Sequence, residues 1–88
     1  MLRISVVKEL GDGTQLQLEG SLVGPWVDEL RKQGEQALSE SKPVSLDLGK
    51  LWFVDTVGVA LLRELSQRGV ACLNCSNFVG AQLKETNL

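Results

Sequence analysis

Alternation of apolar and polar residues near the start of the chain predicts two strands that each bury one face. Residues 2–6 alternate in this way, and residues 15–19 repeat the pattern. Between them lie Gly11, Asp12 and Gly13, which tolerate the positive φ that a tight hairpin needs. The pattern therefore predicts an antiparallel hairpin at the N-terminus.

Helical spacing of apolar residues follows the hairpin. A helix is predicted to begin at Gly24 and Pro25, since proline at the first helical position lacks an N–H that would be unpaired there. Its apolar stripe consists of Trp26, Val27, Leu30, Ala37 and Leu38, with Gly34 on the same face. A second helix is predicted from Val57 to Arg68, ended by Gly69, and a shorter third one over residues 77–84.

Two further strands complete the order of elements. Residues 44–48 form the third strand, which Gly49 is expected to end, and residues 70–73 form a fourth. The order is β-β-α-β-α-β-α, in which the first two helices are right-handed crossovers between parallel strands. The prediction is an α/β fold with a mixed, mostly parallel four-stranded sheet and helices packed on it, as a single domain over residues 1–88.

Charge and composition restrict the classes of function. The net charge is −2 and the charges are scattered, so nucleic acid is not expected as a partner. The sequence has neither the roughly 20 apolar residues of a membrane span nor a signal peptide, which predicts a cytoplasmic protein without direct membrane insertion. Histidine is absent, so we expect no catalysis, no metal and no cofactor. The sequence leaves open whether the chain forms a weak homodimer.

The segment from Phe53 to Val59 places an acid and a hydroxyl at the start of the second helix. One interpretation is capping, in which Asp55 or Thr56 accepts a hydrogen bond from an otherwise unpaired N–H of the first turn. The other is that Thr56, beside a glycine that permits close approach, is an accessible phosphoacceptor. Residue chemistry alone leaves both open.

The stretch from Leu46 to Leu62, LDLGKLWFVDTVGVALL, resembles the signature of STAS domains, which occur in anti-sigma-factor antagonists and in small subunits of some ABC-type lipid transport systems. The resemblance implies that Thr56 is the phosphoacceptor, with Asp55, Gly58 and Val59 as its matching neighbours. Val57 stands where many antagonists have a second hydroxyl. The implied partner is an anti-sigma-factor kinase, or alternatively the ATPase of an ABC-type lipid transporter bound constitutively by unmodified Thr56.

A partner-docking face is predicted around Thr56. The loop from Ser21 to Gly24 leaves a strand at the same sheet end as Thr56, where partners tend to collect. We therefore expect the partner-binding residues to be Leu22, Val23, Gly24, Asp55, Val57, Gly58, Val59 and Leu62. The alternative for Leu22 and Val23 is that they tuck under the first helix as a hydrophobic staple. Trp52 and Phe53 are expected to cover the end of the core, although an exposed Trp52 would suit an interface.

Cys72 and Cys75 have the spacing of a thiol redox pair or of half a zinc site. No third cysteine or histidine completes four ligands, and Cys72 falls within a predicted strand instead of opening a helix. We interpret the pair as a core cysteine and a strand-end cysteine, with a thiol redox protein as a further alternative. Asp47 is expected to anchor the loop before Asp55.

Overall fold

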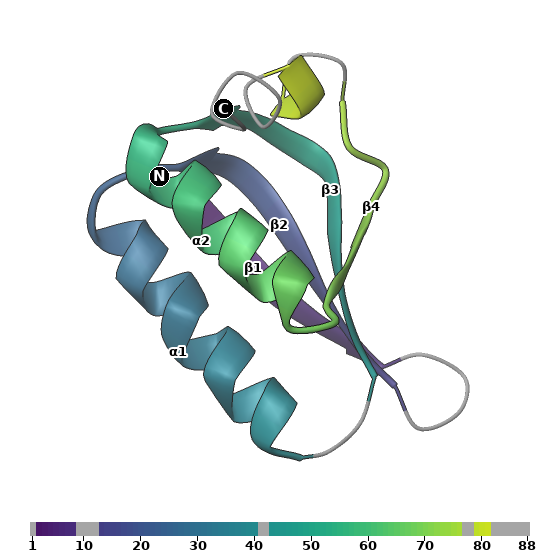
Figure 1. Cartoon of the computed structure of the whole chain (residues 1–88). Coiled ribbons are helices and arrows are strands. Elements are labelled where there is room, and N and C mark those ends of the chain that lie inside the picture. Colours follow the sequence, from purple (N-terminus) through teal and green to yellow (C-terminus); the bar gives the residue numbers. More distant parts are fainter. Residues whose placement is uncertain (1, 9–12, 41–42, 77–78, 82–88) are drawn as a thin grey trace.

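A sheet with two helices packed on one of its faces makes up most of the described chain (Figure 1). The computed structural model describes residues 2–8, 13–40, 43–76 and 79–81. Its elements are β1 (Leu2–Lys8), β2 (Thr14–Leu22), α1 (Pro25–Ser39), β3 (Val44–Val54), α2 (Thr56–Gln67) and β4 (Ala71–Leu73).

The strands follow the order β1-β2-β3-β4 across the sheet. β1 pairs with β2 antiparallel, whereas β2 with β3 and β3 with β4 are parallel. α1 connects β2 to β3, and α2 connects β3 to β4. Because both connections move to the next strand in the same direction across the sheet, right-handed crossovers place the two helices on the same face. The predicted fold class is confirmed. Of the predicted third helix, residues 79–81 are helical, and the rest of that prediction lies outside the described residues.

β3 is longer than predicted. Gly49 does not end it, because the strand continues to Val54 through two register irregularities against β2. Gln17 and Glu19 face Asp47 and Lys50, so β3 has one residue more than β2 in this interval, and Trp52 is a second extra residue between Leu51 and Phe53. A bulge absorbs a glycine or an added residue without ending the ladder, so the prediction of a break was wrong.

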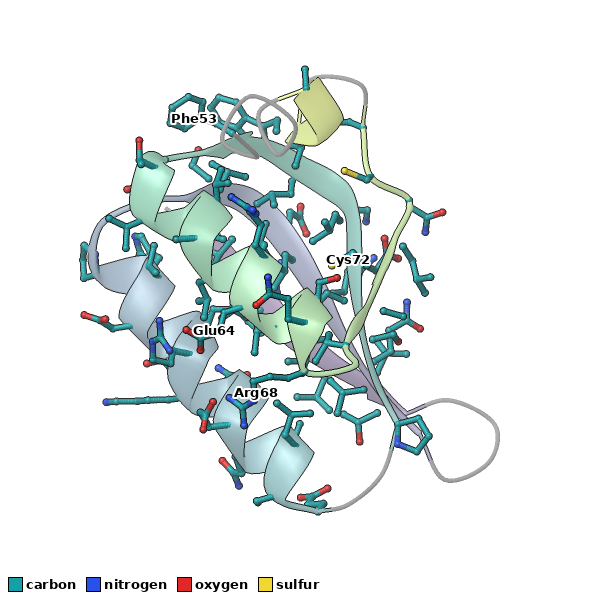
Figure 2. The ribbon with its side chains drawn as sticks, viewed as in Figure 1. Phe53, Glu64, Arg68 and Cys72 are labelled. Atoms are coloured by element: carbon teal, nitrogen blue, oxygen red, sulfur yellow. The ribbon has the colours of Figure 1, made fainter. Side chains whose placement is uncertain are left out.

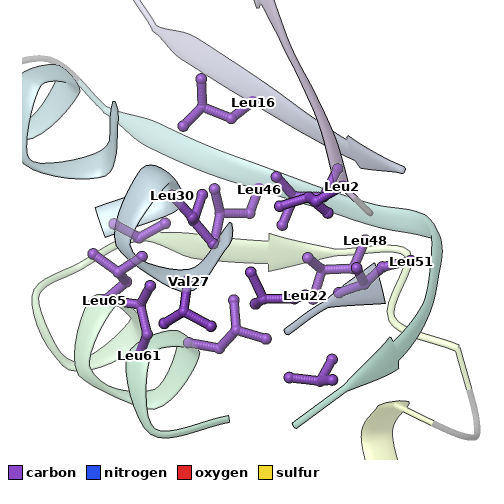
Figure 3. Close-up of a cluster of buried hydrophobic side chains, with 14 of the residues drawn as sticks. Leu2, Leu16, Leu22, Val27, Leu30, Leu46, Leu48, Leu51, Leu61 and Leu65 are labelled. Atoms are coloured by element: carbon purple, nitrogen blue, oxygen red, sulfur yellow. The ribbon is translucent and has the colours of Figure 1, made fainter. Parts of the chain in front are cut away.

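The core fills the single layer between the sheet and the helices (Figure 3). Val27 and Leu30 of α1 and Leu61 and Leu65 of α2 pack onto leucines of the strands. Completely buried leucines include Leu16, Leu18, Leu22, Leu46 and Leu48. Burial of each such side chain contributes roughly 1.5–3 kcal/mol, so the helices are held on the sheet mainly by this layer.

α1 and α2 are also joined along their facing flanks. Arg31 donates to Glu64 at 2.7 Å, and Arg68 pairs with Glu35, so each helix supplies one acid and one base (Figure 2). Both pairs are partly exposed, and exposed pairs of this kind contribute little to stability. As a result, Arg31 and Glu35, which lie on the flank of α1 that faces α2, are both paired.

Candidate functional site

Asp55 joins the two loops that lie at the C-terminal ends of β2 and β3. Its Oδ1 accepts from the Gly58 N–H at 2.7 Å and caps α2, while its Oδ2 accepts from the Gly24 N–H at 3.0 Å, at the start of α1. The backbone N–H of Asp55 donates to the Leu22 carbonyl at 3.1 Å. Of the two capping alternatives, Asp55 is therefore the cap, and the same carboxylate fixes the loop before α1.

Gly24 is suited to its position by its backbone. It has φ 55° and ψ −130°, a conformation that side chains rarely permit, and it precedes Pro25 as the N-cap of α1. The N-cap residue of α1 makes no side-chain capping hydrogen bond. The Gly24 N–H donates instead to the carboxylate of Asp55, from the other loop. The two loops are thus placed together at one sheet end, as the sequence predicts.

Thr56 is the first residue of α2 and is exposed. The helix begins one residue earlier than predicted, so the hydroxyl lies on its leading turn. Because Asp55 already accepts from the Gly58 N–H, the Thr56 hydroxyl is not needed to cap the helix. Thr56 is therefore an exposed residue of the leading turn, next to a carboxylate whose two oxygens are both occupied.

Gly58 has an internal role. It is buried, and a Cβ at this position would lie 2.8 Å from Val54 Cγ1 and 2.9 Å from the Leu22 carbonyl oxygen. The close approach that this glycine permits is therefore made within the chain, by the side chain of Val54 and the backbone of Leu22. Gly58 lets the first turn of α2 sit directly on the ends of β2 and β3.

Three residues predicted for the docking face belong to the core. Leu22 is 0% exposed, Val59 2% and Leu62 1%, so their side chains are not on the surface. The expectation that they form the docking face is corrected: an apolar residue beside a loop here packs beneath the helices. Of the two alternatives for the loop, burial applies to Leu22, whereas Val23 is half-buried.

The end of β3 and the first turn of α2 instead expose other apolar residues. Trp52 is 68% exposed, Phe53 38% and Val57 62%. Together with Thr56 they form what we call the apical surface, and Figure 2 places Phe53 at the end of the molecule where α2 begins. Trp52 is the extra residue of the second β3 irregularity, and bulges commonly re-aim side chains in this way. From the sequence, Thr56 and Val57 are predicted in the site and an exposed Trp52 would suit an interface, but Phe53 is expected at the end of the core.

The cysteines and Asp47 lie at the other edge of β3. Cys72 is half-buried in β4 and Cys75 is exposed, both are free, and burial raises the pKa of both thiols. Asp47 Oδ1 accepts from the Gly49 N–H at 2.9 Å and from Asn74 Nδ2 at 3.1 Å, and these bonds lower the pKa of this carboxyl. Asp47 therefore anchors the β3 irregularity to the end of β4.

The described residues contain no group of three or more metal-ligating side chains. No described helix has the length and apolar content to span a bilayer.

Comparison with known proteins adds a family and a fold. A family model described as Mlab, STAS domain matches residues 5–74. Similar solved structures include the anti-sigma factor antagonist SpoIIAA in its unphosphorylated form, with 21% identity over 93% of this chain and 82% of that one and a TM-score of 0.69. An antisigma-factor antagonist STAS domain from Rhodobacter sphaeroides shares 17% identity over 83% of this chain and 86% of that one, with a TM-score of 0.63.

An uncharacterized protein with a SpoIIAA-like fold from Shewanella loihica has 14% identity over 98% of this chain and 76% of that one, with a TM-score of 0.60. Identities this low show a common fold and no more. No curated protein matches the chain significantly.

Proposed function

The chain belongs to the STAS domain family, and from that premise we propose that it is a non-catalytic protein-binding module whose partner docks on the apical surface and responds to phosphorylation of Thr56. The proposed partner resembles an anti-sigma-factor kinase. The observation that carries the proposal is that Thr56 is exposed on the first turn of α2, near the exposed residues Trp52, Phe53 and Val57 in the sequence.

The apical surface has the composition of a binding site. Tryptophan is enriched among the residues that dominate protein interfaces, because a large ring is desolvated with little loss of conformational entropy. The exposed side chains of Trp52 and Val57 contribute little to this chain's own core, so a partner accounts for their exposure better than folding does.

A phosphate on Thr56 would change this surface without unfolding it. The cap of α2 is supplied by Asp55, so modification of the neighbouring hydroxyl removes no hydrogen bond of the helix. It would add about −1.5 to −2 charges to an apolar surface and next to a carboxylate. A partner that fits the neutral hydroxyl would have to desolvate that charge, and a loss of only about 2.7 kcal/mol weakens binding a hundredfold.

The test uses phosphorylation and binding together. The chain is incubated with an anti-sigma-factor-type kinase and ATP, and the phosphate is mapped by mass spectrometry, with Thr56→Val as the unmodifiable variant. Binding is then measured for Thr56→Glu and for Ser66→Glu, which adds the same charge at the exposed far end of α2. We expect phosphate on Thr56 and loss of binding with Thr56→Glu alone. Phosphate only at other residues contradicts the proposal.

A second candidate function is a constitutive subunit that binds the ATPase of an ABC-type lipid transporter. The observation that favours it is the strongly apolar apical surface, with Val57 where a second hydroxyl would otherwise stand, since permanent interfaces are the more hydrophobic class. In that case the ATPase is recovered equally by the wild-type chain and by Thr56→Glu, whereas Trp52→Ala loses it. This result would decide against the phosphorylation-dependent function.

A further inference from the structure

A groove runs between β1 and α1, away from the apical surface. It consists of two hollows of about 280 and 200 Å³ that adjoin at Gln33, which lines both. Val6 lies in the first hollow, and Ile4 and Trp26 lie in the second. Val6 is 60% exposed, because α1 and α2 pack mainly on β2 and β3 and leave the helix side of β1 partly open. We call this feature the β1–α1 groove.

The rim of the β1–α1 groove is acidic. Glu29 borders the hollow at Trp26, and Glu40 borders the hollow at Val6. None of the described residues that line either hollow is basic. Glu29 accepts a hydrogen bond from Gln33 at 3.3 Å, and Glu40 has no ion pair among the described residues. On the opposite flank of α1, Arg31 and Glu35 are each paired with a charged residue of α2 or its C-cap.

β1 is also an edge strand with a free side. It stands at one end of the strand order, and within the described part of the chain no other strand pairs with its outer edge. It is seven residues long, contains neither proline nor glycine, and exposes Val6 and Val7 on opposite faces. β4, at the other end, has only three residues. A long edge with exposed apolar residues offers unpaired N–H and C=O groups to an added strand.

We propose that an extended segment of another protein adds to β1 as a further strand and fills the β1–α1 groove. Its backbone would pair with the edge of β1, and branched apolar side chains would cover Ile4 and Val6. A lysine or arginine near each end would reach Glu29 and Glu40. This site is separate from Thr56, so the inference does not rest on the proposed function.

The positions of the two acids set the spacing of the bases. Glu29 and Glu40 are eleven residues apart on α1, which is roughly 16 Å at about 1.5 Å per residue. A strand covers about 3.3 Å per residue, and side chains on one face recur every second residue. The two bases are therefore four or six residues apart, with apolar residues alternating between them.

A second copy of this chain fits the groove less well than a basic segment. Pairing of two β1 edges would bring two acidic α1 flanks to the same seam, in a protein whose net charge is already −2. Like charges brought together across an interface suppress association, whereas a basic segment is attracted to the rim. Charge therefore favours a foreign, basic strand as the occupant.

The test uses the peptide acetyl-KTVTVTK-amide against the Trp52→Phe variant, in which Trp26 is the remaining tryptophan and reports from the groove. The controls are ETVTVTE, which reverses the charge, and KTVPVTK, which cannot complete the strand. Binding is followed by Trp26 fluorescence, and the bound strand is located by hydrogen exchange of the β1 amides. The same titration is run on Glu29→Lys/Glu40→Lys, on Asp28→Lys as an exposed control on α1, and on Thr56→Glu.

We expect saturable binding of the lysine peptide, at least about tenfold tighter than either control peptide, with slowed exchange in β1. Glu29→Lys/Glu40→Lys should reverse the preference for peptide charge, while Asp28→Lys and Thr56→Glu leave it unchanged. Equal binding of the three peptides, binding without β1 protection, or no binding at millimolar peptide would each overturn the proposal. A dimer that protects β1 in the absence of peptide would overturn it in favour of a second copy.

Discussion

Gly58 and Gly34 are both buried glycines within helices, and we predict that replacing each by alanine has opposite effects on stability. At Gly58 the new Cβ would meet Val54 Cγ1 at 2.8 Å and the Leu22 carbonyl oxygen at 2.9 Å. At Gly34 it would meet only the terminal carbons of Leu65, at 3.5 and 3.6 Å, which is ordinary van der Waals contact.

The magnitudes follow from two competing effects. Alanine is better than glycine inside a helix by about 1 kcal/mol, and this gain applies to both positions. Gly34→Ala should therefore stabilise the fold by up to about 1 kcal/mol. At Gly58 the overlap includes a backbone oxygen that also accepts the Asp55 N–H, so it cannot be relieved by a side-chain rotation alone. Overpacking costs about 1–3 kcal/mol, which exceeds the helix gain and leaves a net loss of up to about 2 kcal/mol.

Urea unfolding of the two variants, followed by circular dichroism, measures these differences directly. The midpoint should fall for Gly58→Ala and rise for Gly34→Ala with unchanged slopes, because neither replacement alters the surface exposed on unfolding. A Gly58→Ala variant at least as stable as the wild type would refute the close approach of α2 to the strand ends. A loss at Gly34 as large as at Gly58 would show that helix position, not this contact, decides the outcome.

Three further predictions concern the polar anchors and the thiols. Asp55→Ala should lower the free energy of unfolding by about 1–3 kcal/mol, because the Gly58 and Gly24 N–H groups both lose their acceptor, and Asp55→Asn should lose less; chemical denaturation of both variants checks this. The pKa of Asp47 is lowered in the folded state, so its ionised carboxylate adds to the free energy of unfolding above the unfolded-state pKa near 4. This stabilisation is lost as the pH falls through the folded-state pKa, so the free energy of unfolding of Asp47→Asn, measured against pH, should fall less steeply in acid than that of the wild type. Burial raises the pKa of Cys72 and Cys75, so iodoacetamide should modify both slowly at pH 7, the half-buried Cys72 more slowly, as followed by mass spectrometry; rapid modification of Cys72 would instead favour a thiol redox protein.

The sequence predicts the order of strands and helices well because these depend on local periodicity. Alternation in residues 2–6 and the stripe of α1 each require only that one face be apolar. The polar anchors were predicted in part. The sequence left the cap of the second helix open between Asp55 and Thr56. It predicted that Asp47 anchors a loop before Asp55, whereas Asp47 bonds Gly49 and Asn74. What periodicity cannot show is a bulge, because one inserted residue reverses which face every later side chain occupies.

The candidate site contains the main misinterpretations for that reason. Trp52 is itself the second insertion in β3 and Phe53 follows it, so both are exposed although they are adjacent in a strand. Leu22 was assigned to the surface because an apolar residue beside a loop suits either an interface or a core, and Val59 and Leu62 of the second helix were placed on the same face. The choice between these depends on how closely α2 approaches the sheet, which Gly58 sets through contacts with residues distant in the sequence.

The carboxylate of Asp55 also has a consequence for the entropy of association. Since each of its oxygens is engaged by a different loop, Gly24 and the first turn of α2 are held in one arrangement before anything binds. When a partner binds this end of the molecule, these backbone segments lose little further conformational entropy. More of the interaction energy therefore appears as binding affinity.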